Sequence, residues 1–87
     1  MIINAKGVSV NVKAGLSSVP NTDGVGAKLV SLINTHTSAA LVAVNPDGTN
    51  FYVGAGERVV VQKDPEATID GTAGGGPIWA TAVGFTN

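Results

Sequence analysis

The stretch Ala40-Leu41-Val42-Ala43-Val44-Asn45-Pro46-Asp47-Gly48-Thr49-Asn50-Phe51-Tyr52-Val53 decides the fold. Two short apolar segments, residues 40–44 and 50–53, flank a turn in which Pro46, Asp47 and Gly48 suit successive turn positions. This pattern predicts a β-hairpin. Elsewhere in the chain apolar residues recur with a period of two rather than 3.6, which is typical of strands. The sequence therefore predicts an all-β protein.

Further strands are predicted on both sides of this hairpin. Residues 29–33 and 40–44 are dense in β-branched and other apolar residues, so we expect them at the centre of a sheet or inside an assembly. Residues 54–57 predict a chain reversal. The strand predicted at residues 58–63 ends at Asp64-Pro65, because proline donates no backbone hydrogen bond. The remaining predicted strands are residues 8–13, 58–63, 67–69 and 78–85, and a glycine-rich connection spans residues 71–77.

These elements predict one domain over residues 1–87, a small antiparallel β-sandwich or barrel of about six to seven short strands. One segment, residues 16–27, has turn-forming residues but little periodicity. Long connections without secondary structure are often functional. We therefore expect an extended loop at 16–27 that orders against a neighbouring molecule.

The composition indicates that the domain associates with other proteins. A chain of 87 residues has a small core, and the usual supports for such a domain are disulfides, a structural metal or association. The sequence has no cysteine and a single histidine, His36. Charged residues make up 13% of the chain, against about 25% in a typical soluble domain. We therefore expect a homo-oligomer or a larger assembly rather than a monomer.

Charge and hydropathy disfavour two classes of partner. The net charge is −1, and the five basic residues are scattered along the chain, so no basic stripe is available for phosphates and we expect no nucleic-acid binding. The longest apolar run, residues 39–44, is far shorter than the roughly 20 residues that span a bilayer, so we expect no membrane partner. No charged leader with an apolar segment follows Met1, which predicts synthesis in a cytoplasm.

Candidate catalytic and metal-binding groups are weak. His36 with Ser38 or Ser17 is an imaginable base and nucleophile, but no Gly-x-Ser-x-Gly pattern occurs. Most carboxylates lie next to glycine or proline, where they support turns, and Asp64, Glu66 and Asp70 lack the spacing of a calcium loop. Gly74-Gly75-Gly76 is followed by a predicted strand rather than a helix, and no Gly-Lys-Ser/Thr comes after it. Both features disfavour a phosphate-binding loop. We predict no catalytic residue, no metal and no cofactor.

The aromatic residues leave alternatives open. Phe51 and Tyr52 are neighbours on one strand and must point to opposite faces. Trp79 shares its face with Thr81, Val83 and Phe85, an apolar set that is either core or an interface anchor. A third alternative is a sugar-stacking platform formed by Trp79 and Tyr52.

Four segments in the second part of the chain follow one another in a characteristic order. They are Leu32-Ile33-Asn34-Thr35, Ser38-Ala39-Ala40-Leu41-Val42-Ala43-Val44, Phe51-Tyr52-Val53-Gly54-Ala55-Gly56-Glu57-Arg58-Val59-Val60-Val61-Gln62-Lys63-Asp64-Pro65 and Trp79-Ala80-Thr81-Ala82-Val83-Gly84-Phe85-Thr86-Asn87. In these segments the sequence resembles the small virion structural proteins of tailed phages, especially those of cyanobacterial phages. The resemblance covers about residues 29–87.

This resemblance implies a non-enzymatic capsid decoration or cement protein on the virion surface. Its partner is then the major capsid protein, and its own oligomer is expected to be a trimer. The contact residues that we predict are Val8, Val10, Val12, Val19, Pro20, Tyr52 and Trp79. The alternative function is a tail-fibre or receptor-binding module that binds carbohydrate through Tyr52 and Trp79.

Overall fold

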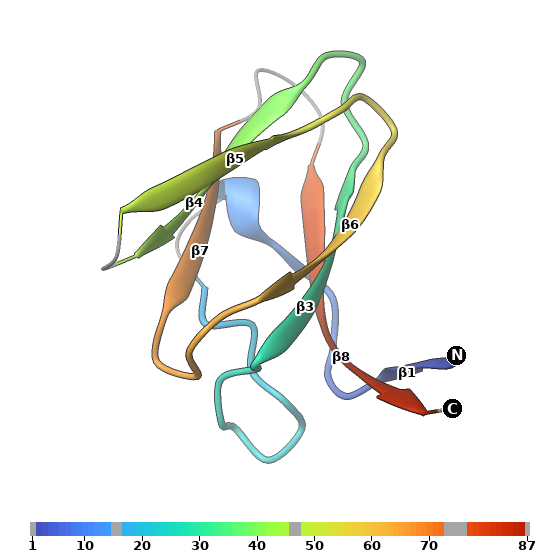
Figure 1. The fold of residues 1–87 in the computed structure, drawn as a ribbon, viewed down its shortest axis with the longest axis vertical. Helices are drawn as coiled ribbons and strands as arrows, with labels where there is room; N and C mark the ends of the chain where they lie inside the picture. The colour runs from blue at the N-terminus through green and yellow to red at the C-terminus, as the bar shows by residue number, and fades with distance from the viewer. Residues whose placement is uncertain (1, 15–16, 46–47, 73–76, 87) are drawn as a thin grey trace.

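The computed structural model describes residues 2–14, 17–45, 48–72 and 77–86. Two antiparallel sheets pack against each other (Figure 1), which confirms the predicted all-β, sandwich-type fold. The five-stranded sheet has the order β1-β8-β3-β6, with β2 also paired to β8, and the three-stranded sheet has the order β5-β4-β7. The strands are β1 (Ile2–Ala5), β2 (Val10–Asn11), β3 (Leu29–Asn34), β4 (Ala40–Asn45), β5 (Thr49–Val53), β6 (Arg58–Gln62), β7 (Thr68–Thr72) and β8 (Ile78–Thr86).

The predicted hairpin is present as β4 and β5. The two strands pair antiparallel, from Ala40 opposite Val53 to Val44 opposite Thr49. Gly48 closes the connection: its N–H donates to the Val44 carbonyl at 2.9 Å, and its φ of 74° lies in the region that favours glycine. Pro46 and Asp47 lie outside the described residues.

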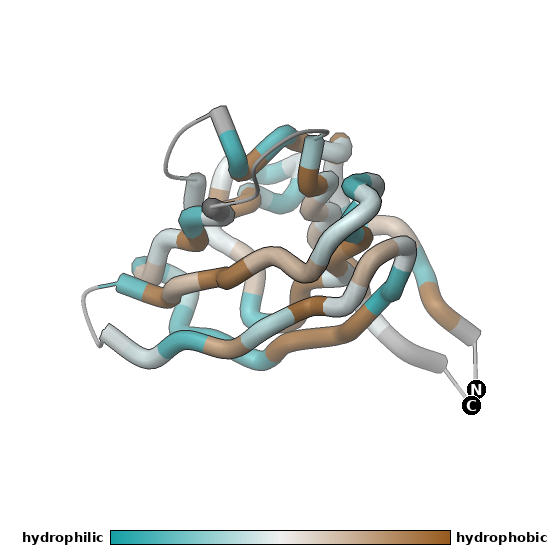
Figure 2. The backbone as a smooth tube through the Cα atoms, turned by 90° about the horizontal axis from the view of Figure 1, so that it is seen from above, coloured by the Kyte–Doolittle hydropathy of each residue, from teal (hydrophilic) through white to brown (hydrophobic). Residues whose placement is uncertain are grey.

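Regular alternation between buried and partly exposed residues builds the core. Figure 2 colours the backbone by hydropathy and shows hydrophobic residues recurring along the strands. In β3 and β4 every second residue is buried, so both strands are central in their sheets but have one partly exposed face in the single chain. Phe51 packs against the core while the next residue, Tyr52, is exposed, as strand geometry requires. The core cluster consists of Val12, Val19, Ala27, Val30, Leu32, Ala40, Val42, Val53, Ile69, Ile78, Ala80 and Ala82.

The predicted strand over residues 8–13 is wrong in most of its length. Only Val10 and Asn11 pair with β8, and a 3₁₀ turn, η1 (Val12–Ala14), follows at once. The Asn11 side chain explains the change, because its Oδ1 accepts from the N–H of Lys13 at 3.1 Å and from that of Ile78 at 3.3 Å. Such a side chain competes with strand pairing and favours a turn. The turn packs against β7 and β8.

The predicted loop packs against its own chain over the described residues 17–27, and its contact with a neighbour stays a prediction. Ser17 bridges to Ile69, and Pro20 bridges to Gly26. Val19 is fully buried with a φ of 51°, an unusual conformation for a β-branched residue. The Ser17 Oγ accepts from the Val19 N–H at 3.0 Å. Core burial and this local bond therefore hold Val19 against the body of its own chain. Leu16 lies outside the described residues.

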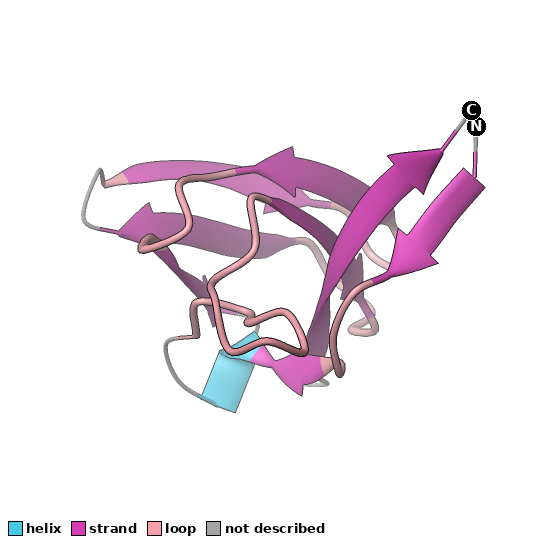
Figure 3. Ribbon diagram, turned by 90° about the horizontal axis from the view of Figure 1, so that it is seen from below, coloured by secondary structure: helices cyan, strands magenta, loops and turns pink. Residues whose placement is uncertain are grey.

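The first strand, β1, is not among the seven strands that the sequence predicts. It pairs with the last part of β8, from Ile2 opposite Thr86 to Ala5 opposite Val83. This β1–β8 ribbon is the part of the five-stranded sheet that projects beyond the rest of the sandwich, and Ile2 lies opposite Thr86 at its tip (Figure 3). An isolated two-stranded ribbon is only marginally stable in water, so its attachment to the body through β8 fixes it.

Candidate interaction surface

The outer face of the five-stranded sheet is the strongest candidate for a functional surface. In one row across three strands, Ile33 of β3 lies between Trp79 of β8 and Arg58 of β6. In the next row, Ser31 lies between Thr81 and Val60. These six strand positions alternate with buried positions such as Leu32 and Ala80, so their side chains point away from the core. We call these six residues the β3 outer face.

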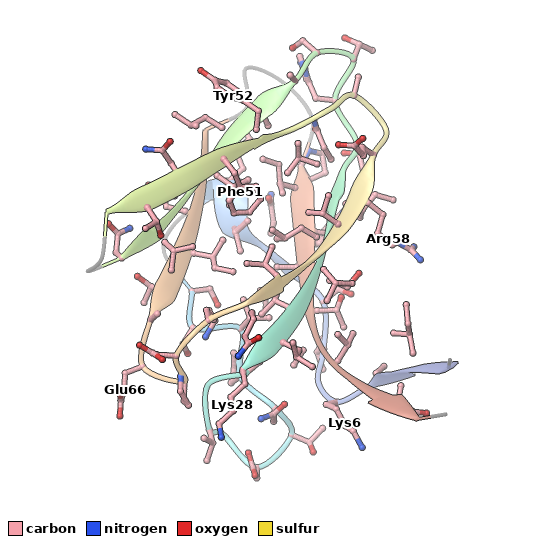
Figure 4. All side chains as sticks on the ribbon, in the orientation of Figure 1. Lys6, Lys28, Phe51, Tyr52, Arg58 and Glu66 are labelled. Carbon is pink, nitrogen blue, oxygen red and sulfur yellow. The ribbon has the colours of Figure 1, made fainter. Side chains whose placement is uncertain are left out.

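This face combines the apolar side chains of Trp79, Val60 and Ile33 with the polar ones of Ser31, Thr81 and Arg58. Trp79 is 39% exposed and Val60 is 40% exposed. Arg58 supplies the face's one charge and points away from the body of the protein (Figure 4). Among the described residues, no carboxylate forms an ion pair with Arg58. An aromatic anchor beside aliphatic side chains and an arginine is a composition enriched at the centres of protein interfaces.

Tyr52 lies on the other side of the sandwich. It is 72% exposed and pairs with Leu41 on the outer face of the three-stranded sheet. Trp79 points outward from the opposite sheet. The structure therefore does not bring Trp79 and Tyr52 together, and a sugar-stacking platform made of both is wrong. Of the alternatives for Trp79, the core position is wrong, because its side chain is exposed on the outer face of β8.

The remaining predicted contact residues divide into exposed and buried ones. Val8 is 77% exposed, and Pro20 and Val10 are partly buried. Val12 and Val19 are both fully buried in the core of their own chain, so the predicted partner contacts through them are wrong. Val12 is buried because η1 packs against β7 and β8, and Val19 because the segment 17–27 folds back onto β7.

Asn34 organises one end of the sandwich, which the sequence analysis does not anticipate. The side chain is fully buried at the end of β3. Its Nδ2 donates to the carbonyls of Ser38 at 2.9 Å, Val53 at 3.1 Å and Gly54 at 3.2 Å. The signal in the sequence is weak, because asparagine at a strand end is also typical of exposed turns. Asn34 ties the connection after β3 to the turn after β5.

His36 and Ser38 lie in the connection that Asn34 holds. The Asn34 Oδ1 accepts from the His36 backbone N–H at 2.9 Å. The His36 Nδ1 accepts from the Ser38 backbone N–H at 3.1 Å and lies 2.8 Å from the Ser38 Oγ. The structure thus brings the candidate base next to the candidate nucleophile. Because Nδ1 also accepts from the backbone, the pair has the form of a local turn motif.

Two of the carboxylates stabilise turns, as predicted, by accepting from nearby backbone N–H groups. The Asp23 Oδ1 accepts from the Val25 N–H at 2.9 Å, and the Glu57 Oε1 accepts from the Gly54 N–H at 3.0 Å. Within the described ranges, no group of three or more histidine, cysteine, aspartate or glutamate residues is placed to hold a metal ion. Gly74, Gly75 and Gly76 lie outside those ranges.

Lys63 is the one buried charged residue of the described core. Its side chain is 7% exposed, and its Nζ donates to the Asp64 backbone carbonyl at 3.2 Å. Burial lowers the pKa of Lys63, and the negative charge of Asp64 opposes this effect. Lys63 follows β6 on the side of the sheet that faces the core, away from the β3 outer face.

Comparison of the chain with protein-family models, curated proteins and solved structures found no match. In the part of the chain that the structure describes, no helix is long and apolar enough to cross a membrane.

Proposed function

We propose that this protein is a non-enzymatic structural module that docks on a protein surface. Within that class, the resemblance of residues 29–87 to virion structural proteins of tailed phages favours a capsid decoration or cement protein. Its partner is the major capsid protein, and its location is the virion surface. The chain itself is proposed to be a homo-oligomer, for which the resemblance implies a trimer.

The exposed apolar character of the β3 outer face carries this proposal. Trp79 and Val60 flank Ile33 and Ser31 on a three-stranded platform whose other side is the core. Burying the exposed apolar area against a partner contributes about 25 cal/mol per Å² removed from water. The platform is held by paired strands on both sides of β3, so little ordering of the backbone opposes docking.

Small contacts on many copies support a cement role. A single copy of this size offers a modest contact area, so one contact alone is weak. An oligomer that presents several identical faces to a repeating lattice dissociates only when all contacts open together. Retention on a capsid therefore follows from avidity rather than from one strong site.

The copy number of the protein in purified virions tests this proposal. Quantitative mass spectrometry against the major capsid protein is expected to give hundreds of copies per particle. A count of roughly three to twelve would place the protein at a tail or portal position instead. Addition of purified protein to heads that lack it provides a second test: saturable binding that Trp79→Ala weakens supports docking through this face, and no binding contradicts it.

A carbohydrate-binding module is the second candidate, because hydroxyl groups lie beside Trp79. Thr81 is two residues along β8 on the same face, and its Oγ1 lies 2.6 Å from the Ser9 Oγ. An indole ring beside hydrogen-bonding groups is suited to stack on one sugar ring. Binding on a glycan array that Trp79→Ala abolishes, with an unchanged circular dichroism spectrum, favours this candidate. The same binding is not expected to change with Tyr52→Ala, since Tyr52 lies on the opposite side.

A further inference from the structure

The row Trp79–Ile33–Arg58 has two unlike ends around a central residue. Trp79 and Arg58 are each one strand away from Ile33, a distance of about 4.8 Å in a β-sheet. An arginine guanidinium placed over the face of a tryptophan ring is attracted to its π-electrons. One end of the row is therefore chemically complementary to the other, although the two ends of a single chain are separated by β3.

A second copy of the chain satisfies both ends at once. Rotation by 180° about an axis parallel to β3, lying over Ile33, exchanges the two sides of the row and turns the copy face down. Trp79 of each copy then lies over Arg58 of the other, and Thr81 of each lies over Val60 of the other. Residues on β3 itself, such as Ser31, meet their own equivalents near the axis.

We propose that the β3 outer face is a twofold contact between two copies of this chain, with Trp79 of one copy packed on Arg58 of the other. The inference rests on the proposed docking function and names a second copy of this chain, in place of the major capsid protein, as the partner of that face. A twofold contact uses the same patch on both molecules, so a patch with complementary ends suits it. Since the face holds no acidic residue, the aromatic ring of Trp79 is the group on the face that fits Arg58.

The expected dimer is weak. Three strands about 4.8 Å apart and five residues about 3.3 Å apart make a platform roughly 14 Å by 17 Å. This platform is small beside the roughly 800 Å² per partner that is buried in a standard interface. We therefore expect association in the micromolar to millimolar range, visible as a mass that rises with protein concentration.

Analytical ultracentrifugation of the full chain, from about 10 μM to about 1 mM, tests the contact. The wild type is expected to shift from monomer to dimer, and Trp79→Ala and Arg58→Glu are each expected to weaken this step at least about tenfold. Tyr52→Ala is the matched control, because it removes an exposed aromatic from the opposite side. Arg58 is exposed, so Arg58→Glu keeps the test open where Trp79→Ala fails to fold.

A cysteine placed near the axis gives an independent readout, because the natural chain has no cysteine. Ser31→Cys is close to isosteric and is expected to form covalent dimers with a short bismaleimide. Asn50→Cys, which is exposed on the three-stranded sheet, is expected to react without forming dimers. Crosslinking of Ser31→Cys is expected to fall when Arg58→Glu is added.

The outcomes separate this inference from the proposed function. A dimer that depends on Trp79 and Arg58 supports the inference, as does a hexamer in which such contacts join two trimers. A monomer at about 1 mM, a simple trimer or a dimer insensitive to both substitutions overturns it. Head binding that persists in any of these cases leaves the docking function standing, whereas a Trp79-dependent dimer that binds no heads contradicts only that function.

Discussion

Replacement of Asn34 by alanine is expected to remove a large part of the stability of this domain. The two N–H groups of the buried amide are shared among three backbone carbonyls, and its oxygen accepts from one backbone N–H. Each neutral hydrogen bond contributes about 1 kcal/mol, and a buried polar group left without a partner costs about 1–3 kcal/mol. The carbonyls of Ser38 and Gly54 lie near the surface, so water replaces the lost donor there. We therefore expect the free energy of unfolding to fall by about 3–5 kcal/mol in total.

Urea-induced unfolding followed by circular dichroism measures this loss. A domain of this length has a total unfolding free energy of roughly 4–13 kcal/mol, so Asn34→Ala is expected to be partly or fully unfolded in buffer if the wild type lies at the low end. With a urea slope of about 1 kcal/mol per molar, the midpoint is expected to fall by about 3 M or more.

Asn50→Ala is the matched control for this prediction. Asn50 is exposed on β5, and its substitution is expected to change the unfolding free energy by less than about 0.5 kcal/mol. The isosteric Asn34→Asp substitution places a carboxylate against three carbonyls and is expected to be at least as destabilising at neutral pH, with partial recovery as the pH falls. A loss below about 1 kcal/mol for Asn34→Ala would refute the assigned role of the amide.

Three further substitutions test the packing. Lys63→Met is expected to raise stability at pH 7 by about 1 kcal/mol, because burial of the charged amine lowers its pKa in the folded state. For the same reason, wild-type stability is expected to rise with pH between the lowered pKa of Lys63 in the folded state and its ordinary value of 10.5. In this range the unfolded chain binds more protons than the folded one. Lys63→Met should lack this rise in alkaline urea titrations. Gly26→Ala is expected to cost more than about 2 kcal/mol, because its Cβ would overlap the Pro65 carbonyl; thermal unfolding that is unchanged would contradict the close contact. Val12→Ala is expected to cost about 2 kcal/mol, while Val8→Ala, at an exposed position, should have no measurable effect; equal effects would show that η1 does not close the core.

Local signals were sufficient to predict the elements that form from neighbouring residues. The Asn45–Gly48 turn and the flanking alternation define β4 and β5, because hairpin partners are close in the sequence. Short apolar runs rich in β-branched residues, bounded by turn-forming residues, likewise predict β3, β6 and β8. In contrast, η1 depends on Asn11 accepting from Ile78, which is 67 residues away. A contact of that separation leaves no local pattern, so residues 8–13 read as a strand.

The candidate surface was only half predictable for a related reason. Strand geometry correctly groups Trp79 with Thr81 on one face of β8, but both faces of the strand are apolar. A large aromatic residue is usually expected inside. Here the small side chains of Ala80 and Ala82 fill the inner positions opposite Leu32 and Val30, so the indole is left outside. Only the packing of the second sheet decides between the two faces.

The β1–β8 ribbon has a practical consequence for handling the protein. Since Ile2 pairs with Thr86, a purification tag or fluorescent protein fused at either end emerges at the same place, beyond the sandwich. A few-residue linker should be enough to join the ends into a cyclic backbone. Reopening that backbone at an exposed turn gives a circular permutant whose cargo is displayed from another side of the molecule.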